Sequence, residues 1–246
     1  MGILNINKMR LEIGGAQIIH NISFEVNKNS FVSVIGPSGC GKSTMLRIIA
    51  GLLPPTSGTV TYINKKITKP IKDISFVFQD FALLPWLTNM ENVELGLSYF
   101  DMDEDKRRDS AHKLLIKFGL EGFENAYPNV LSGGMKQRVG IARAIAQEPS
   151  VLLMDEPFSS LDELTANTLR NDIRSMLNSK DIPVSLVLMV THNVEEAVQM
   201  SDRIIVLSNK PTIVKEIKDI DMSYPRNRHT KEFIKNVDSL YLSLTK

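Results

Sequence analysis

One stretch decides the fold of this chain: Gly36-Pro37-Ser38-Gly39-Cys40-Gly41-Lys42-Ser43-Thr44. It fits the phosphate-loop pattern G-x-x-x-x-G-K-[ST] without a gap. The apolar run 31–35 before it has the length of a buried strand, and residues 45–50 after it begin a helical pattern that ends at Gly51. Strand, glycine loop and helix come in the order of a triphosphate site, so we predict that all nine residues of the loop contact nucleotide.

The residue types in this loop suit a bound anion. Gly36, Gly39 and Gly41 allow positive φ and a close approach of backbone N–H groups to phosphates. Lys42 would lie along the β- and γ-phosphates, and the Ser43 hydroxyl would bind Mg²⁺. Two interpretations of the neighbouring cysteine stay open, because residue 40 could be a small filler of the loop or a thiol with a pKa lowered by the helix N-terminus.

Composition limits the classes of protein to consider. The 246 residues allow one large domain, with or without a subdomain, and the 29 basic and 28 acidic residues nearly cancel. We therefore expect no nucleic-acid surface built on net charge. Cys40 is the only cysteine, no apolar run approaches membrane-spanning length, and the first residues do not resemble a signal peptide. Any membrane role should be peripheral.

The periodicity along the chain predicts an α/β protein. Short alternating strands between residues 3 and 26 predict a small antiparallel sheet, and further strands are expected at 59–63 and 74–78. Helical spacing prevails between 88 and 147. Further strands follow, of which the first two are expected to be buried, with a crossover helix between those two and a helix around Phe233–Leu240 near the end. The apolar runs that predict those strands are 151–156, 186–190, 204–207 and 213–214.

Charged side chains stand where two of these predicted strands end. Asp155 and Glu156 would be costly at the end of a buried strand unless their charge is used. Mg²⁺ held by Ser43 and Asp155 would leave Glu156 to orient and deprotonate the attacking water. His192, which follows the next buried strand, could hydrogen-bond the γ-phosphate or that water.

A second candidate anion cradle opens a helix at Leu131-Ser132-Gly133-Gly134-Met135-Lys136-Gln137. One ATP cannot use both cradles of the same chain if the helical block projects away from the phosphate loop. We therefore expect a head-to-tail dimer of two copies, with each ATP between the phosphate loop of one copy and this segment of the other.

In this combination of motifs the chain resembles the nucleotide-binding subunits of ABC transporters. The motifs that carry the resemblance are Walker A at Gly36–Thr44, the Q-loop at Gln79, the signature Leu131-Ser132-Gly133-Gly134, Walker B ending at Asp155-Glu156, the D-loop Ser159-Ser160-Leu161-Asp162 and the switch His192. They stand in family order and span nearly the whole chain.

The resemblance implies one ABC ATPase domain over 1–246. Its P-loop NTPase core would be a parallel sheet with an N-terminal antiparallel β subdomain, from about 1–87 and 148–246, and the helical signature subdomain would be inserted at about 88–147. It also implies ATP and Mg²⁺ as cofactors.

The resemblance assigns roles to individual residues. Nucleotide contacts would come from Ser132, Gly133, Gly134 and Gln137, and the Mg²⁺ ligands would be Ser43, Gln79 and Asp155. Catalytic roles would belong to Glu156, His192, Gln79 and Lys42, and Asp162 would couple the two ATP sites.

One residue departs from the family pattern. Members usually stack adenine on an aromatic side chain ahead of the phosphate-loop strand, and the position that aligns here is Ile13. An aliphatic side chain supplies only part of a stacking energy of about 1–3 kcal/mol. We therefore expect weak discrimination between ATP and GTP.

The segment Phe81-Ala82-Leu83-Leu84-Pro85-Trp86-Leu87 is unusually apolar for a surface loop. It could be core beneath the helical block, or a docking surface for a membrane permease with Trp86 as anchor. The resemblance favours the importer branch for nitrate, sulfonates and taurine, at the cytoplasmic face of the membrane, with an extracytoplasmic solute-binding protein acting through the permease. A soluble ABC-type ATPase and a phosphate-loop kinase are the alternatives.

A basic cluster precedes the last predicted helix. Its members are Arg226, Arg228, His229 and Lys231. We expect solvated surface, with contact to lipid headgroups as the second interpretation.

Overall fold

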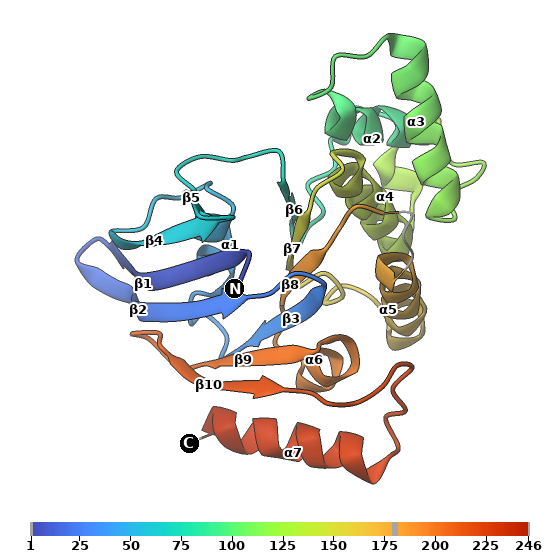
Figure 1. Ribbon diagram of the computed structural model, residues 1–246. Coiled ribbons are helices and arrows are strands. Elements are labelled where there is room, and N and C mark those ends of the chain that lie inside the picture. Colours follow the sequence, from blue (N-terminus) through green and yellow to red (C-terminus); the bar gives the residue numbers. More distant parts are fainter. Residues whose placement is uncertain (1, 179–181, 246) are drawn as a thin grey trace. The chain divides into compact units, whose positions relative to one another are not determined.

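The computed structural model describes residues 2–178 and 182–245, which form two compact units (Figure 1). The first unit contains Met1–Ile71 and Ser185–Lys246, and the second contains Lys72–Val184. Among the residues described, no helix is both long and apolar enough to cross a membrane.

The first unit begins with an antiparallel sheet in the order β2-β1-β4-β5. Its strands are β1 (Leu4–Ile13), β2 (Ala16–Val26), β4 (Ser57–Tyr62) and β5 (Lys65–Lys66). The antiparallel sheet confirms the prediction, but the short separate strands expected between 3 and 26 are two long strands whose register shifts along their length. Such shifts interrupt the alternation of buried side chains, and in sequence an interruption looks like a strand end.

A second sheet in this unit is built on β3 (Ser30–Ile35). It pairs in parallel with β8 (Leu186–Val190) and with β9 (Arg203–Leu207), and β10 (Val214–Asp219) pairs antiparallel with β9. β8 is buried at every position. Uninterrupted apolar runs suit parallel strands that are covered on both faces, which explains why the sequence shows no alternation there.

Helices α1 (Lys42–Ile49), α6 (Val194–Met200) and α7 (Lys231–Thr245) complete the first unit. α7 lies beside α6 and β9, where Phe233, Val237 and Leu240 join one buried apolar cluster (Figure 1). The closing helix predicted from this spacing is therefore confirmed, although Ile234 on its other side is 49% exposed.

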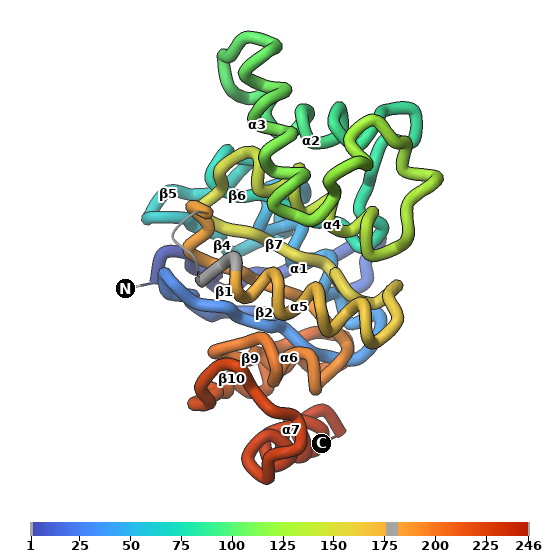
Figure 2. Tube along the Cα trace, turned by 90° about the vertical axis from the view of Figure 1, so that its right-hand side faces the viewer, coloured from blue at the N-terminus to red at the C-terminus, as the bar shows by residue number. Residues whose placement is uncertain are grey.

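The second unit contains two parallel strands and the remaining helices. Its elements are β6 (Ile74–Val77), α2 (Asn89–Leu97), α3 (Glu104–Lys117), the short 3₁₀ helix η1 (Pro128–Val130), α4 (Gly133–Ala146), β7 (Val151–Asp155) and α5 (Glu163–Asn178). Helices α2, α3 and α4 pack against one another (Figure 2). The helical block expected at 88–147 holds these three helices, whereas the compact unit also includes the paired strands β6 and β7 and helix α5.

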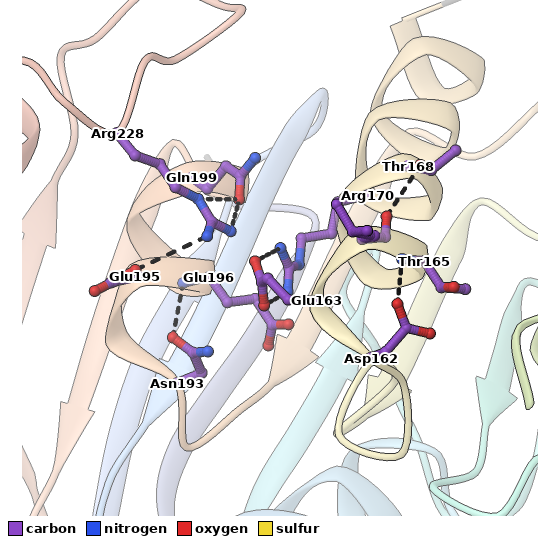
Figure 3. A network of polar contacts seen from close by, with 11 residues as sticks. Asp162, Glu163, Thr165, Thr168, Arg170, Asn193, Glu195, Glu196, Gln199 and Arg228 are labelled. Atoms are coloured by element: carbon purple, nitrogen blue, oxygen red, sulfur yellow. Dashed lines mark hydrogen bonds and ion pairs between the residues drawn. The ribbon is translucent and has the colours of Figure 1, made fainter.

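The basic cluster before α7 is not uniformly solvated, which corrects the expectation for Arg226. Its side chain is only 8% exposed and donates to the carbonyls of Val198 and Ser201 at the end of α6, each at 2.6 Å. A guanidinium at a helix C-terminus satisfies carbonyls that lack helical partners. Arg228 bonds Gln199 and lies 3.9 Å from Glu195 (Figure 3). Its charge is thus engaged within the protein.

Candidate functional site

The phosphate loop joins the carboxyl end of β3 to the first turn of α1. Two of its glycines have left-handed backbone, with φ of +73° at Gly39 and +105° at Gly41, the residue before the helix. An L side chain is strained at such angles, so the turn requires glycine there. A Cβ built on Gly39 would meet nothing within 4 Å, so the backbone is open at this point to an approaching group.

Lys42 provides the positive charge of the loop. Its side chain is only 5% exposed, and its Nζ donates to the carbonyls of Gly36 at 2.9 Å and Pro37 at 3.0 Å. The ammonium is therefore fixed at the loop instead of extending into solvent. A fixed cation, an open glycine turn and the N-terminus of α1 together suit the phosphates of a nucleotide.

Cys40 is packed inside this loop. It is 2% exposed, and the Thr212 hydroxyl, itself fully buried, donates to its carbonyl oxygen. Burial raises the pKa of the thiol above its usual value, and the nearby Lys42 offsets only part of that rise. The structure therefore favours the filler interpretation over a thiol activated by the helix N-terminus.

His192 follows the strand next to β3. β8 pairs with β3 in parallel, Val190 opposite Val34, and the N–H of Thr191 donates to the Val34 carbonyl at 3.2 Å. His192 and the first glycine of the phosphate loop therefore lie at the same carboxyl edge of this sheet, which is where α/β proteins bind ligands. The imidazole is exposed.

Ile13 ends β1 beside the Gly14-Gly15 turn and is 56% exposed. An exposed aliphatic side chain at a hairpin is available for contact with a flat ring, but it has no π-face of its own. The position thus allows the predicted adenine contact without stacking between two aromatic rings.

The second unit brings Gln79, Asp155 and Glu156 to one sheet edge. β6 and β7 are parallel, with Val77 opposite Met154, so each strand delivers its polar residues at the same end. Asp155 is 3% exposed, whereas Gln79 is exposed. A buried carboxylate beside more accessible polar groups suits a cation and a water-handling base.

Glu156 has a left-handed backbone with φ of +45°. A non-glycine residue in this region is strained and persists only where the surrounding structure fixes it. This strained residue places its carboxylate at the point where the chain leaves β7. Strained backbone is typical of residues whose orientation matters for chemistry.

The signature segment forms the N-terminus of α4. The Ser132 hydroxyl accepts from the N–H of Met135 at 3.3 Å, so this serine is a helix cap. A Cβ on Gly134 would lie 2.6 Å from Cγ2 of Thr165, so a larger residue here would force the Thr165 side chain to shift. Oδ1 of Asp162 accepts from the N–H of Thr165 at 3.0 Å (Figure 3), a bond that lowers the pKa of this carboxyl. The signature thus packs on the turn that begins α5.

Gln137 lies elsewhere than the sequence predicted. Its side chain is fully buried, and its Nε2 donates to the carbonyl of Pro157 in the turn after β7. A side chain without exposed surface cannot contact nucleotide in this conformation. We therefore correct its role from ligand contact to a link between the signature helix and the turn that follows Glu156.

Comparison with known proteins identifies this combination of loops. A family model described as ABC transporter matches residues 19–159. The chain belongs to the ABC transporter family. An uncharacterized ABC transporter ATP-binding protein of Methanocaldococcus jannaschii is 45% identical over 232 residues, which cover 94% of this chain and 85% of that protein.

Two further relatives are informative about the cassette. The aliphatic sulfonates import ATP-binding protein SsuB of Bacillus thuringiensis subsp. konkukian is 41% identical over 222 residues, which cover 90% of this chain and 86% of that protein. A solved dimeric ATP-binding cassette in a post-hydrolysis state, bound to ADP and Pi, has a TM-score of 0.78 and 34% identity, with 89% of this chain and 100% of that chain covered. The predicted family, the P-loop fold and ATP hydrolysis are confirmed, and the kinase alternative is excluded.

The apolar segment 81–87 of the cassette is buried at one end and exposed near the other. Phe81 is 6% exposed and belongs to the core, whereas Trp86 is 69% exposed. Two side chains that the sequence did not single out, Asn92 and Arg143, bond the backbone of this segment. Nothing in the local pattern marks either residue, because the carbonyls that they bond belong to a segment whose position depends on tertiary packing.

Proposed function

We propose that this cassette is the ATP-hydrolysing subunit of an importer and powers uptake of a small solute through a permease. Exposed Trp86, on a segment whose backbone is bonded by Asn92 and Arg143, supports the transport role because tryptophan is enriched among the anchoring residues of interfaces. The likeness to a sulfonate importer subunit supports a cargo of the nitrate, sulfonate or taurine type.

We propose that residues 36–44 bind the phosphates of ATP. Lys42 would hold the β- and γ-phosphates with its fixed ammonium. The donor set of Ser43, Gln79 and Asp155 fits Mg²⁺, which prefers hard oxygen ligands and, when bound, neutralises charge on the phosphates. The position of Asp155 at the end of β7 supports this assignment, because a carboxylate supplies the hard oxygen that Mg²⁺ prefers.

The remaining polar residues would perform the hydrolysis. We propose that the Glu156 carboxylate orients the attacking water and accepts its proton, and that His192 donates a hydrogen bond to the γ-phosphate or that water. The strained backbone of Glu156 and the position of His192 at a sheet edge support these roles. Ile13 would contact adenine from its exposed hairpin.

We further propose that two copies of the chain hold ATP between them. Ser132, Gly133 and Gly134 of one copy would face the phosphates bound by the loop of the other, and Asp162 would couple the two sites. The dimeric cassette with ADP and Pi supports this arrangement. The two copies would lie at the cytoplasmic face of the membrane, bound to the permease. An extracytoplasmic solute-binding protein would act through the permease from the opposite side.

The test replaces Glu156 by glutamine in the full chain. Glu156→Gln should bind ATP, lower the hydrolysis rate by roughly 100-fold or more, and form a stable dimer in ATP and Mg²⁺ by light scattering. Glu121→Gln, a change at an exposed residue of the same unit, is the control. An ordinary rate or a strictly monomeric variant would contradict the proposal, and failure to co-purify with a membrane permease would favour the soluble non-transport ATPase.

A further inference from the structure

The segment Phe81–Leu87, here called the docking segment, begins with a strained backbone. Phe81 has φ of +62° and Ala82 has φ of +45°, and neither is glycine. Left-handed backbone at two successive non-glycine residues is costly, and outside a two-residue hairpin turn it persists where other contacts hold it. Contacts from α4 and α2 hold the turn that leads from buried Phe81 to exposed Trp86.

Arg143 of α4 supplies the first contacts. Its Nη1 donates to the Ala82 carbonyl at 2.8 Å and its Nη2 donates to the Phe81 carbonyl at 2.6 Å. Burial lowers the pKa of this guanidinium, and nearby Asp80 acts in the opposite direction. A planar fork with two donors matches two adjacent carbonyls in a way that a single ammonium cannot.

Close packing makes this connection stiff. A Cβ on Gly140, one turn before Arg143, would lie 3.1 Å from the Cβ of Phe81. A Cβ on Gly96 of α2 would lie only 2.1 Å from the Arg143 carbonyl oxygen. Both glycines therefore permit an approach of backbone that larger residues would prevent, and such contacts transmit displacement instead of absorbing it.

Asn92 of α2 fixes the other end of the docking segment. Its fully buried amide accepts from the Leu84 N–H at 2.8 Å and donates to the carbonyls of Leu84 at 3.1 Å and Leu87 at 3.2 Å. The backbone is thus held on both sides of Trp86, which is 69% exposed. A rigid loop loses little freedom when a partner binds its exposed side chain.

We propose that Arg143 is a positioning residue that fastens the docking segment to the signature helix α4, so that the segment and the helix move as one body. The inference rests on the proposed docking role of Trp86. Because α4 begins at Gly133, its ten-residue rise of about 15 Å separates the signature from this anchor. A displacement of the signature would then reach Trp86 through one helix and one side chain.

The chain contains its own probe, since Trp86 is its single tryptophan. The experiment records Trp86 anisotropy decay and hydrogen exchange of amides 82–87 in the full chain and in Arg143→Met. Arg138→Met is the matched control, because Arg138 also lies on α4 and donates to the Phe118 carbonyl at 3.0 Å and to Asp172 at 2.8 Å.

Arg143→Met should at least double the amplitude of fast local motion at Trp86 and accelerate exchange of these amides at least tenfold. Arg138→Met should leave both readouts as in the wild type, even if it lowers the Tm as much. Arg143→Lys keeps the charge but loses the planar pair of donors of the guanidinium. Its values of both readouts should lie between those of Arg143→Met and those of the wild type. If Arg143→Met does not fold, Arg143→Lys decides by the same two readouts.

A second readout tests transmission from the signature. In a Glu156→Gln background, ATP with Mg²⁺ should shift the Trp86 signal, and adding Arg143→Met should abolish that shift while Arg138→Met preserves it. Equal behaviour of the two arginine variants would overturn the positioning role alone. Absence of ATP hydrolysis in the wild type and of a dimer in Glu156→Gln would instead overturn the proposed function.

Discussion

The phosphate loop and the docking segment are both short turns with left-handed backbone, yet they are held in different ways. In the phosphate loop the left-handed angles fall on Gly39 and Gly41, and Lys42 bonds carbonyls five and six residues away. In the docking segment they fall on Phe81 and Ala82, and the guanidinium that bonds them is 62 and 61 residues distant. The first turn has glycine where the backbone is left-handed and bonds its own lysine, whereas the second has other residues there and bonds a distant arginine.

This difference explains what the sequence could and could not predict. A loop whose geometry depends on its own glycines and lysine shows that geometry as a fixed spacing, so the succession of strand, glycine loop and helix could be predicted from residues alone. A loop that depends on Asn92 and Arg143 shows only an apolar composition. Sequence therefore left the core and docking interpretations of 81–87 open. The structure places Phe81 in the core and leaves Trp86 exposed, where docking is our proposal.

The two corrections have the same physical origin. Arg226 and Gln137 are polar residues that the sequence places on a surface or at a ligand, yet both are buried against backbone carbonyls. Buried carbonyls at helix ends and turns must find donors, and which side chain supplies them depends on tertiary packing. The periodicity of a sequence indicates which apolar residues are buried. It does not indicate which polar side chain bonds a buried carbonyl.

Removing the positive charge of the phosphate loop should have the largest effect. Lys42→Ala removes the ammonium proposed to lie on the phosphates, and we expect ATP affinity to fall by about 2–5 kcal/mol, or roughly 30- to 5,000-fold, by titration with labelled nucleotide. Arg47→Ala, at an exposed position in the last turn of the same helix, should change affinity less than threefold. Equal losses in the two variants would mean that general folding of α1, not the loop, controls binding.

Truncating the exposed side chain tests the docking segment from its outer face. Trp86→Ala should weaken binding to the permease by at least about tenfold, or 1.4 kcal/mol, as expected of an aromatic anchor. The Tm should stay within about 2 °C, because the side chain is 69% exposed. Tyr99→Ala, whose side chain is 66% exposed in the same unit, is the control. A large drop in Tm with unchanged permease binding would assign Trp86 to the core.

A smaller effect is expected where the docking segment passes into α2. Thr88 and Glu91 form a capping box, in which the Thr88 N–H donates to Glu91 at 2.7 Å. Thr88→Ala should lower the free energy of unfolding by about 1 kcal/mol at pH 7, measured by urea denaturation. The hydrogen bonds from the Thr88 backbone and then its hydroxyl lower the pKa of Glu91 below 4.5.

The pH dependence of this cap follows from the direction of that shift. A carboxyl whose pKa is lower in the folded state contributes stability above its unfolded pKa and loses it as the pH falls through the folded pKa. The difference between wild type and Thr88→Ala should therefore be full at neutral pH and shrink below about pH 4. Of the two bonds to the Glu91 carboxylate, only that from the Thr88 hydroxyl is lost in the variant, because the backbone N–H of residue 88 remains. A difference that stays constant from pH 7 to pH 3 would therefore show that this hydroxyl does not stabilise the Glu91 carboxylate.

The smallest effect concerns the base of the nucleotide. We expect the wild type to prefer ATP over GTP by less than roughly a hundredfold, because Ile13 offers no aromatic face. Ile13→Tyr should strengthen ATP binding by about 1 kcal/mol, near fivefold, and Ile13→Val should change it little. Unaltered affinity in the tyrosine variant would show that adenine lies elsewhere.

The buried position of Cys40 makes its reaction with a thiol reagent a measure of how often the phosphate loop opens. As the single thiol of the chain, with 2% of its surface accessible and a raised pKa, it can react with a disulfide reagent only during moments when the loop opens. The half-time of labelling thus reports the frequency of those openings. A ligand that closes the loop should lengthen this half-time in proportion to the occupancy of the ligand.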